Sequence, residues 1–201
     1  MSSPAVMQIA PVVLEGRHIR LEPLALHHLD ALCEVGLDED IWRWIPFQVR
    51  TRDDMLGYIQ TGLQLQAGGS ALPFATIERS TGRAVGSTRY MNIDKPNRRL
   101  EIGSTWIGRP WQRTAVNTEA KYLMLRHAFE QLGCLRVELK TDVLNQRSRN
   151  AILRIGAKQE GIFRKHVVCT SGRIRDSVWF SIVDSEWPEA KAALEAKLAR
   201  T

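Results

Sequence analysis

The chain has 201 residues, enough for one domain with a sizeable core, and its 44% hydrophobic and 25% charged residues are ordinary for a globular protein. No apolar run approaches membrane-spanning length, and the first residues lack the basic and apolar segments of a secretory signal, so we expect neither a membrane anchor nor export. The net charge of +6 favours an anionic ligand, but the dispersed arginines make nucleic acid an unlikely partner.

Cysteine and histidine usage indicates neither a disulfide framework nor a metal site. The three cysteines, Cys33, Cys134 and Cys169, are odd in number and contain no Cys-x-x-Cys pair, which favours a reducing cytoplasm. The five histidines show no metal-ligand spacing. We expect the adjacent His27 and His28, at the start of a helix, to face solvent.

The first half of the chain alternates strands with helices. After a loose leader of 17 residues, we expect a strand over 18–22 and a short helix over 25–35. Thr51 and the acidic residues after it begin a second helix with a capping-box pattern. Residues 74–78 and 84–92 are predicted to form a hairpin around a Thr-Gly turn.

The segment from Arg99 to Gly133 reads as a strand, a polar turn and a helix. Its strand alternates between two sets, Glu101, Gly103 and Thr105 against Ile102, Ser104 and Trp106. Glu101 and Thr105 are therefore predicted to share one face of the sheet. Past Pro110 the apolar spacing becomes helical, and Gly133 stands where a C-terminal cap belongs.

The turn at residues 112–117 has the composition of an anion site. Backbone N–H groups at a helix start have no partner inside the helix, and here they lie beside Arg113. A phosphate would suit this arrangement. The alternative is an ordinary strand-to-helix turn capped by Asn117 or Thr118.

The remaining chain completes an α/β order. We expect a strand over 136–140, a short helix over 145–155, strands over 157–168 and 174–183, and a helix opened by Pro188. The order is β-α-α-β-β-β-α-β-α-β-β, within a single domain whose core covers about 17–184 and whose C-terminal helix covers about 188–200.

This order and the turn resemble the GCN5-related N-acetyltransferases (GNAT), especially the branch that includes ribosomal-protein N-terminal acetyltransferases. That family's pyrophosphate loop is Gln/Arg-x-x-Gly-x-Gly/Ala after a strand; Gln112 matches it, while Ala115 and Asn117 replace the glycines. The run Asn-Thr-Glu-Ala from Asn117 is typical of the branch. The resemblance spans roughly Ile19 to Val183 and implies a mixed central sheet flanked by helices.

The resemblance implies acetyl-CoA as co-substrate and no metal. Its loop would hold the pyrophosphate, provided that φ is negative at Ala115, and Asn145 would contact the pantetheine arm. Ser148 would lie near the thioester sulfur and assist the departing thiolate. The alternative is that Asn145 only caps a helix and Ser148 only fills a turn. The residues expected to bind acetyl-CoA are Thr105, Trp106, Ile107, Gln112, Arg113, Thr114, Ala115, Val116, Asn117, Asn145 and Ser148.

The implied reaction is direct attack of a neutral amine on the acetyl thioester. About a tenth of an α-amine is neutral at pH 7, so a modest base acting through water suffices. Glu101 is the candidate base; the alternative is an ion pair with Arg99 or Arg89. Backbone N–H groups at a strand bulge, around Thr105 to Ile107, would meet the oxyanion.

Two further segments are candidates for contact with the acceptor. Trp42, Trp44, Pro46 and Phe47 lie where the family often builds its acceptor pocket, although core packing explains them equally well. Arg164, Lys165 and His166 are predicted to be a solvated face.

We therefore predict an acetyl-CoA-dependent N-acetyltransferase acting on a primary amine, with a protein N-terminus ahead of small-molecule amines. The resemblance also leads us to expect a cytoplasmic protein and a homodimer. Three alternatives stay open: a transferase using another acyl-CoA such as succinyl-CoA, a non-catalytic acyl-CoA-binding module, and a nucleic-acid-binding module.

Overall fold

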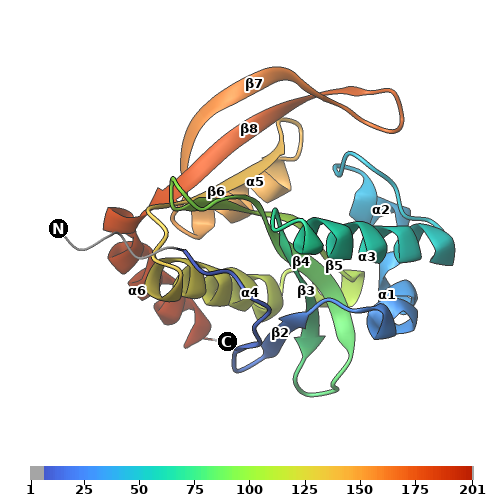
Figure 1. Cartoon of the computed structure of the whole chain (residues 1–201), viewed down its shortest axis with the longest axis horizontal. Helices are drawn as coiled ribbons and strands as arrows, with labels where there is room; N and C mark the ends of the chain where they lie inside the picture. Colours follow the sequence, from blue (N-terminus) through green and yellow to red (C-terminus); the bar gives the residue numbers. More distant parts are fainter. Residues whose placement is uncertain (1–6, 201) are drawn as a thin grey trace.

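The computed structural model describes residues 7–200, and at its centre is one eight-stranded mixed sheet (Figure 1). The strand order is β1-β2-β3-β4-β5-β6-β8-β7, and the β5–β6 pair is parallel while the others are antiparallel. The strands are β1 (Leu14–Glu15), β2 (Ile19–Pro23), β3 (Leu72–Glu78), β4 (Ala84–Asp94), β5 (Arg99–Ile107), β6 (Arg136–Asp142), β7 (Lys158–Val168) and β8 (Ile174–Val183).

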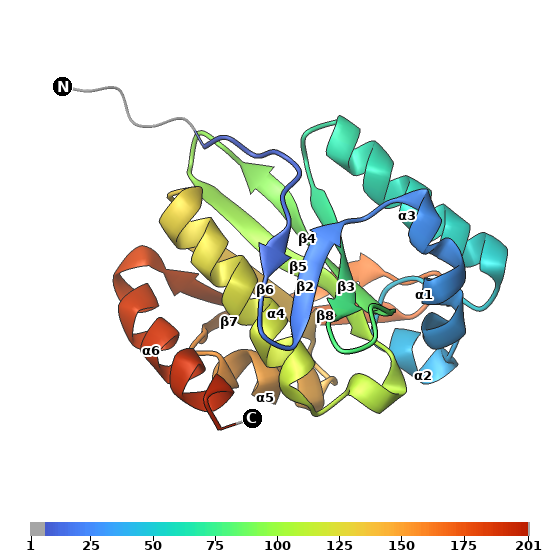
Figure 2. The ribbon, with the colours of Figure 1, turned by 90° about the horizontal axis from the view of Figure 1, so that it is seen from below.

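Helices cover both faces of the sheet and create two apolar cores (Figures 1 and 2). The larger core lies under α4 and α6, and the smaller one lies under α1, α2 and α3. The helices are α1 (Leu29–Gly36), α2 (Glu39–Trp42), α3 (Arg52–Ala67), α4 (Ala115–Arg126), α5 (Gln146–Arg154) and α6 (Trp187–Leu198). A π-helical turn, His127–Gln131, extends α4. No helix within residues 7–200 is both long and apolar enough to cross a bilayer.

The predicted α/β order is confirmed, and local signals account for many of its boundaries. Thr51 caps α3 and forms the expected capping box with Asp54. Gly133 (φ 63°) and Gly156 (φ 94°) adopt the left-handed conformation beyond the ends of their helices.

The predicted leader contains structure that the sequence pattern did not indicate. Met7 is buried in the larger core, and β1 pairs with β2 through Leu14 and Glu15. Residues 1–6 of that leader lie outside the described residues. The short helix α2 was also not predicted; Asp38 caps it by accepting a hydrogen bond from the Asp40 N–H.

The prediction that both neighbouring histidines face solvent is wrong for His28. A 3-10 turn, Leu26–His28, precedes α1 and turns His28 inward, where its Nε2 lies 2.7 Å from Glu22 Oε1. His28 Nδ1 accepts a hydrogen bond from the Ala25 N–H. His27 remains exposed. Glu22, His27 and His28 are close enough together for a metal ion, but the Glu22–His28 contact already occupies two of the three groups.

The sheet opens between its two parallel strands. β5 and β6 pair only from Arg99 to Glu101, opposite Arg136 to Glu138. β5 then continues to Ile107 beside β4, while β6 continues to Asp142 beside β8. Beyond Glu101 the facing edges of the two strands are therefore no longer bonded to each other, and this opening positions the candidate site.

Candidate functional site

A β-bulge on β5 lies next to this opening. Gly103 pairs with Arg89 and Trp106 pairs with Ser87, so Ser104 and Thr105 together stand opposite Thr88. Ser104 adopts a left-handed φ of 49°. The bulge thus overlaps the predicted range of Thr105 to Ile107 only at Thr105, and Trp106 and Ile107 return to regular pairing.

The extra residue reverses the side-chain alternation beyond it. Thr105 turns toward α4, where its Oγ1 lies 2.6 Å from Lys121 Nζ. Trp106 turns to the opposite face and packs 5.3 Å from Trp42, ring centre to ring centre. The prediction that Glu101 and Thr105 share a face is therefore wrong, because a bulge shifts the two-residue period by one position.

Glu101 is buried on the face of the sheet away from α4. Its Oε2 lies 2.9 Å from Lys140 Nζ and accepts a 2.7 Å hydrogen bond from Asn92 Nδ2. The ion pair foreseen with an arginine is thus made with Lys140, because Arg99 turns instead to Asp94 and Glu138. This buried carboxylate therefore has both a cation and an amide donor within hydrogen-bonding distance.

The loop before α4 presents unpaired backbone donors beside arginine. Thr114 is the N-cap, and its Oγ1 accepts from the Val116 N–H, so the alternative caps Asn117 and Thr118 lie inside the helix. Arg113 has a φ of 65°, whereas Ala115 is the first residue of the α-helix. The loop therefore makes its left-handed turn at Arg113, and alanine at position 115 leaves its N–H available.

The Asn-Thr-Glu-Ala run fixes α4 to its surroundings. Glu119 is buried and accepts hydrogen bonds of 2.7, 2.7 and 2.8 Å from the backbone N–H groups of Arg17, His18 and Ile19. Asn117 Oδ1 is buried and has no hydrogen-bond partner within residues 7–200. Glu119 therefore serves the fold, while Asn117 retains an acceptor near the loop.

The start of α5 lies beside the same loop. Arg147 Nη2 donates to Gln112 Oε1 at 2.7 Å, and Gln112 Nε2 donates to the Ile107 carbonyl at 2.9 Å. Asn145 caps α5 by accepting from the Ser148 N–H at 3.0 Å. Two helix starts and the exposed Arg113 and Arg147 thus converge, and this donor set fits a ligand carrying phosphates.

The aromatic segment predicted as an acceptor wall divides between two roles. Trp42 is fully buried and packs against Phe47, Tyr58 and Trp106, so it belongs to the smaller core. Trp44 instead lies under the guanidinium of Arg173, and its carbonyl accepts from Arg175 at 3.3 Å. This segment therefore lies near the β7–β8 hairpin.

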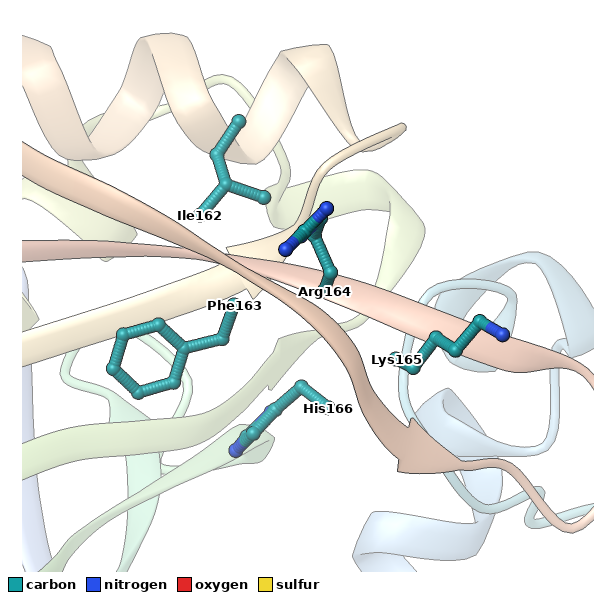
Figure 3. A pocket seen from close by; sticks show the side chains of 5 residues that line it. All are labelled: Ile162, Phe163, Arg164, Lys165 and His166. Carbon is teal, nitrogen blue, oxygen red and sulfur yellow. The ribbon is translucent and has the colours of Figure 1, made fainter.

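The hairpin of β7 and β8 carries an open pocket on its outer strand (Figure 3). Arg164 and Lys165 are exposed, as expected for a solvated face. His166 is not: Figure 3 shows it on the same side of β7 as Phe163, and its Nδ1 lies 3.0 Å from Ser177 Oγ. Its ring also meets Trp179 edge-on. The left-handed φ of 50° at Lys165 breaks the alternation and turns His166 inward.

The sequence analysis did not single out Lys121 and considered Arg89 only as an ion-pair partner of Glu101; both side chains are buried near the bulge. Burial lowers the pKa of Lys121 to about 7. Lys121 lies among the buried residues of α4, next to Ala120 and one turn before Leu125. This helical spacing is the pattern in the sequence that could have predicted its burial. Arg89 lies on β4 opposite Gly103, on a strand that is otherwise buried from Ala84 to Tyr90.

The fold matches that of a solved structure described as a putative acetyltransferase, with a TM-score of 0.86 at 35% identity over 96% of each chain. The chain belongs to this class: the acetyltransferase (GNAT) domain matches residues 18–158. It is accordingly an acetyltransferase of the GNAT family, whose members use acetyl-CoA.

Three similar proteins illustrate the range of this likeness. An uncharacterized N-acetyltransferase, p20 of Bacillus licheniformis, is 27% identical over 87% of this chain and 97% of its own length. The putative ribosomal N-acetyltransferase YdaF of Bacillus subtilis (strain 168) is 33% identical over 55% of this chain and 59% of its own. A crystal structure of a putative acetyltransferase from T. thermophilus superposes with a TM-score of 0.87 at 35% identity, covering 96% of this chain and all of that one.

Proposed function

We propose that this protein transfers the acetyl group of acetyl-CoA to the α-amino group of a protein N-terminus. The observation that carries the proposal is the opening of the sheet beyond Glu101. A bulge at Ser104 and the basic loop before α4 accompany this opening. The similarity to YdaF, described as a putative ribosomal N-acetyltransferase, supports a protein N-terminus over a small amine.

The donor would be held by the loop and the two helix starts. The N–H groups of this loop, other than that of Val116, which donates to Thr114 Oγ1, and the guanidinium of Arg147 suit the pyrophosphate. Asn145 at the start of α5 would contact the pantetheine arm. The strand end from Thr105 to Ile107 would align the thioester. Backbone N–H groups of the bulge that do not pair with β4 would stabilise the oxyanion.

Glu101 is proposed as the base that accepts the amine proton through a water molecule. Lys140 Nζ lies 2.9 Å from the Glu101 carboxylate, and this carboxylate lies on β5 at the point where pairing with β6 ends. An α-amine with a pKa near 8 needs less help than a lysine side chain near 10.4, so a weak base of this kind favours α-amines. Ser148 would donate a hydrogen bond to the departing thiolate.

The test is thiol release from acetyl-CoA with two matched peptides, one with a free N-terminus and no lysine, the other N-blocked with one lysine. We expect turnover of the first peptide, and a loss of about 100-fold in kcat for Glu101→Gln. The exposed Glu189→Gln on α6 is the matched control. Unchanged kcat in Glu101→Gln rejects the base, and turnover of the lysine peptide alone rejects the acceptor.

A further inference from the structure

Arg89 is a buried cation without a counter-charge. Its relative exposure is 5%, and neither Nε nor Nη2 has a hydrogen-bond partner within residues 7–200. The guanidinium lies over the ring of Tyr58, whose centre is 4.8 Å from the guanidinium carbon. Buried guanidinium groups almost always have hydrogen-bonding partners, so these free donors call for a ligand.

The position of Arg89 places it next to the candidate site. It pairs directly with Gly103, the last residue of β5 before the bulge. The Tyr58 hydroxyl that lies beside it contacts Ser87 Oγ at 3.0 Å and the Ser104 carbonyl at 3.4 Å. Arg89 and Tyr58 therefore line the same bulge, on the face of the sheet away from α4.

The neighbouring carboxylates are already engaged. Glu101, which pairs across from Met91 on the same two strands, is bonded to Lys140 and Asn92. Asp142 is bonded to Arg173 and lies 3.9 Å from Arg175. None of the ion pairs found within residues 7–200 includes Arg89.

We propose that Arg89 binds a carboxylate that the acceptor carries close to its reacting amine. A guanidinium offers two parallel N–H donors that match the two oxygens of a carboxylate, and both free donors here stand beside the bulge where the acetyl group is proposed to react. This inference rests on the acetyl transfer in the proposed function and concerns which amines can serve as acceptors. The carboxylate has two sources: an acidic side chain at the start of a protein, or the α-carboxylate of a free amino acid.

The test compares acceptors with and without the carboxylate, with kcat/KM expressed per neutral amine for each acceptor. One pair is a peptide beginning Ser-Asp and its Ser-Asn counterpart; the other is glycine and glycinamide. For the wild type we expect kcat/KM about 10- to 100-fold higher for the acidic member of one pair, mostly through KM. The pair that shows the preference identifies the source of the carboxylate.

The variant Arg89→Gln should abolish that preference, because a neutral amide cannot pair with the charge, and the ratio of kcat/KM between the two members of a pair is the quantity that measures it. Arg89→Lys should retain part of it. The exposed Arg164→Gln on β7 is the control. CoA binding measured by calorimetry verifies that each variant is folded.

The outcomes separate the two proposals. Thiol release with equal kcat/KM for both members of each pair overturns the role of Arg89 and leaves the acetyltransferase reaction standing. An equal loss for both members in Arg89→Gln overturns it as well. Absence of thiol release with every amine overturns the proposed function itself. The wild-type preference requires no variant, so the test does not depend on how Arg89→Gln folds.

Discussion

Lys121 is a charged side chain on the face of α4 that packs against the sheet. Its Nζ lies 2.6 Å from Thr105 Oγ1 and 3.4 Å from Thr88 Oγ1, and burial lowers its pKa to about 7. The Oγ1 atoms of these two threonines are hydrogen-bonded to each other at 2.7 Å across the bulge. Lys121 therefore contacts the bulge from the side of α4. Its burial lowers the stability of the fold whenever the amine is protonated.

The Lys121→Met variant should show this cost as a pH dependence. The folded pKa of about 7 lies below the unfolded value near 10.4, so between these values the unfolded state binds more protons, and wild-type stability rises with pH. Methionine removes that rise and should add about 1–3 kcal/mol at pH 7. Urea unfolding at pH 7 and pH 9 measures both effects.

The matched control is Lys95→Met, an exposed lysine in the turn between β4 and β5. It should keep the wild-type slope of stability with pH. An equal slope in Lys121→Met would show that this lysine is not buried in solution. The kcat of Lys121→Met should also fall, because methionine cannot hold Thr105.

At the scale of elements, local patterns predicted the order of strands and helices but not the irregularities that build the site. Capping at Thr51 and the turn glycines act within a few residues and can be read from the sequence. The bulge was predicted only from the family resemblance, around Thr105 to Ile107, because its left-handed residue is Ser104 and not the neighbouring Gly103. The opening depends on β6 leaving β5 for β8, a choice made by distant parts of the chain.

The inward turn of His28 and the burial of Glu119 could also not be predicted from local patterns. By its sequence, the run from Asn117 to Ala120 is typical of one branch of the family. In the fold, Glu119 accepts three backbone N–H groups from a turn about 100 residues away. A contact over that separation has no signature in the residues on either side of it.

The hydrogen bonds between the Glu119 carboxylate and the backbone of the β1–β2 turn should contribute strongly to the stability of that part of the sheet. Replacing a buried carboxylate that accepts three N–H groups leaves donors unpaired, so Glu119→Gln should cost about 2–4 kcal/mol. Gly16→Ala should also destabilise, since an added Cβ would lie 2.5 Å from Glu119 Cδ. Thermal unfolding measures both.

The exposed Glu189→Gln on α6 is again the control and should leave the melting temperature unchanged. If Glu119→Gln has the melting temperature of the wild type, the hydrogen bonds of the carboxylate to the turn do not contribute to stability. If Gly16→Ala alone is neutral, the Glu119 side chain has room to move.

At the scale of the whole molecule, the sheet consists of two parts joined by a short parallel contact. β1 to β5 form one antiparallel part and β6 to β8 the other, and three residue pairs, beginning with Arg99 and Arg136, connect them. The larger core runs beneath both parts and includes residues of α4, α5 and α6. The position of the site thus depends on where the two parts of the sheet separate. Because both parts share the larger core, the donor loop and the acceptor face keep fixed positions relative to each other.

This arrangement predicts that the phosphates of CoA, rather than its pantetheine arm, dominate binding to the free protein. CoA at about 100 times its Kd should stabilise the fold by about 2.7 kcal/mol, and thus raise the melting temperature by about 5–10 °C. Pantetheine, which lacks the phosphates, should give little shift at the same concentration. The shift with CoA should shrink at high salt and in Arg113→Gln and Arg147→Gln, but not in Arg164→Gln. Equal shifts with pantetheine would contradict a phosphate-binding loop at the start of α4, and a shift with duplex DNA but not with CoA would favour the nucleic-acid-binding alternative.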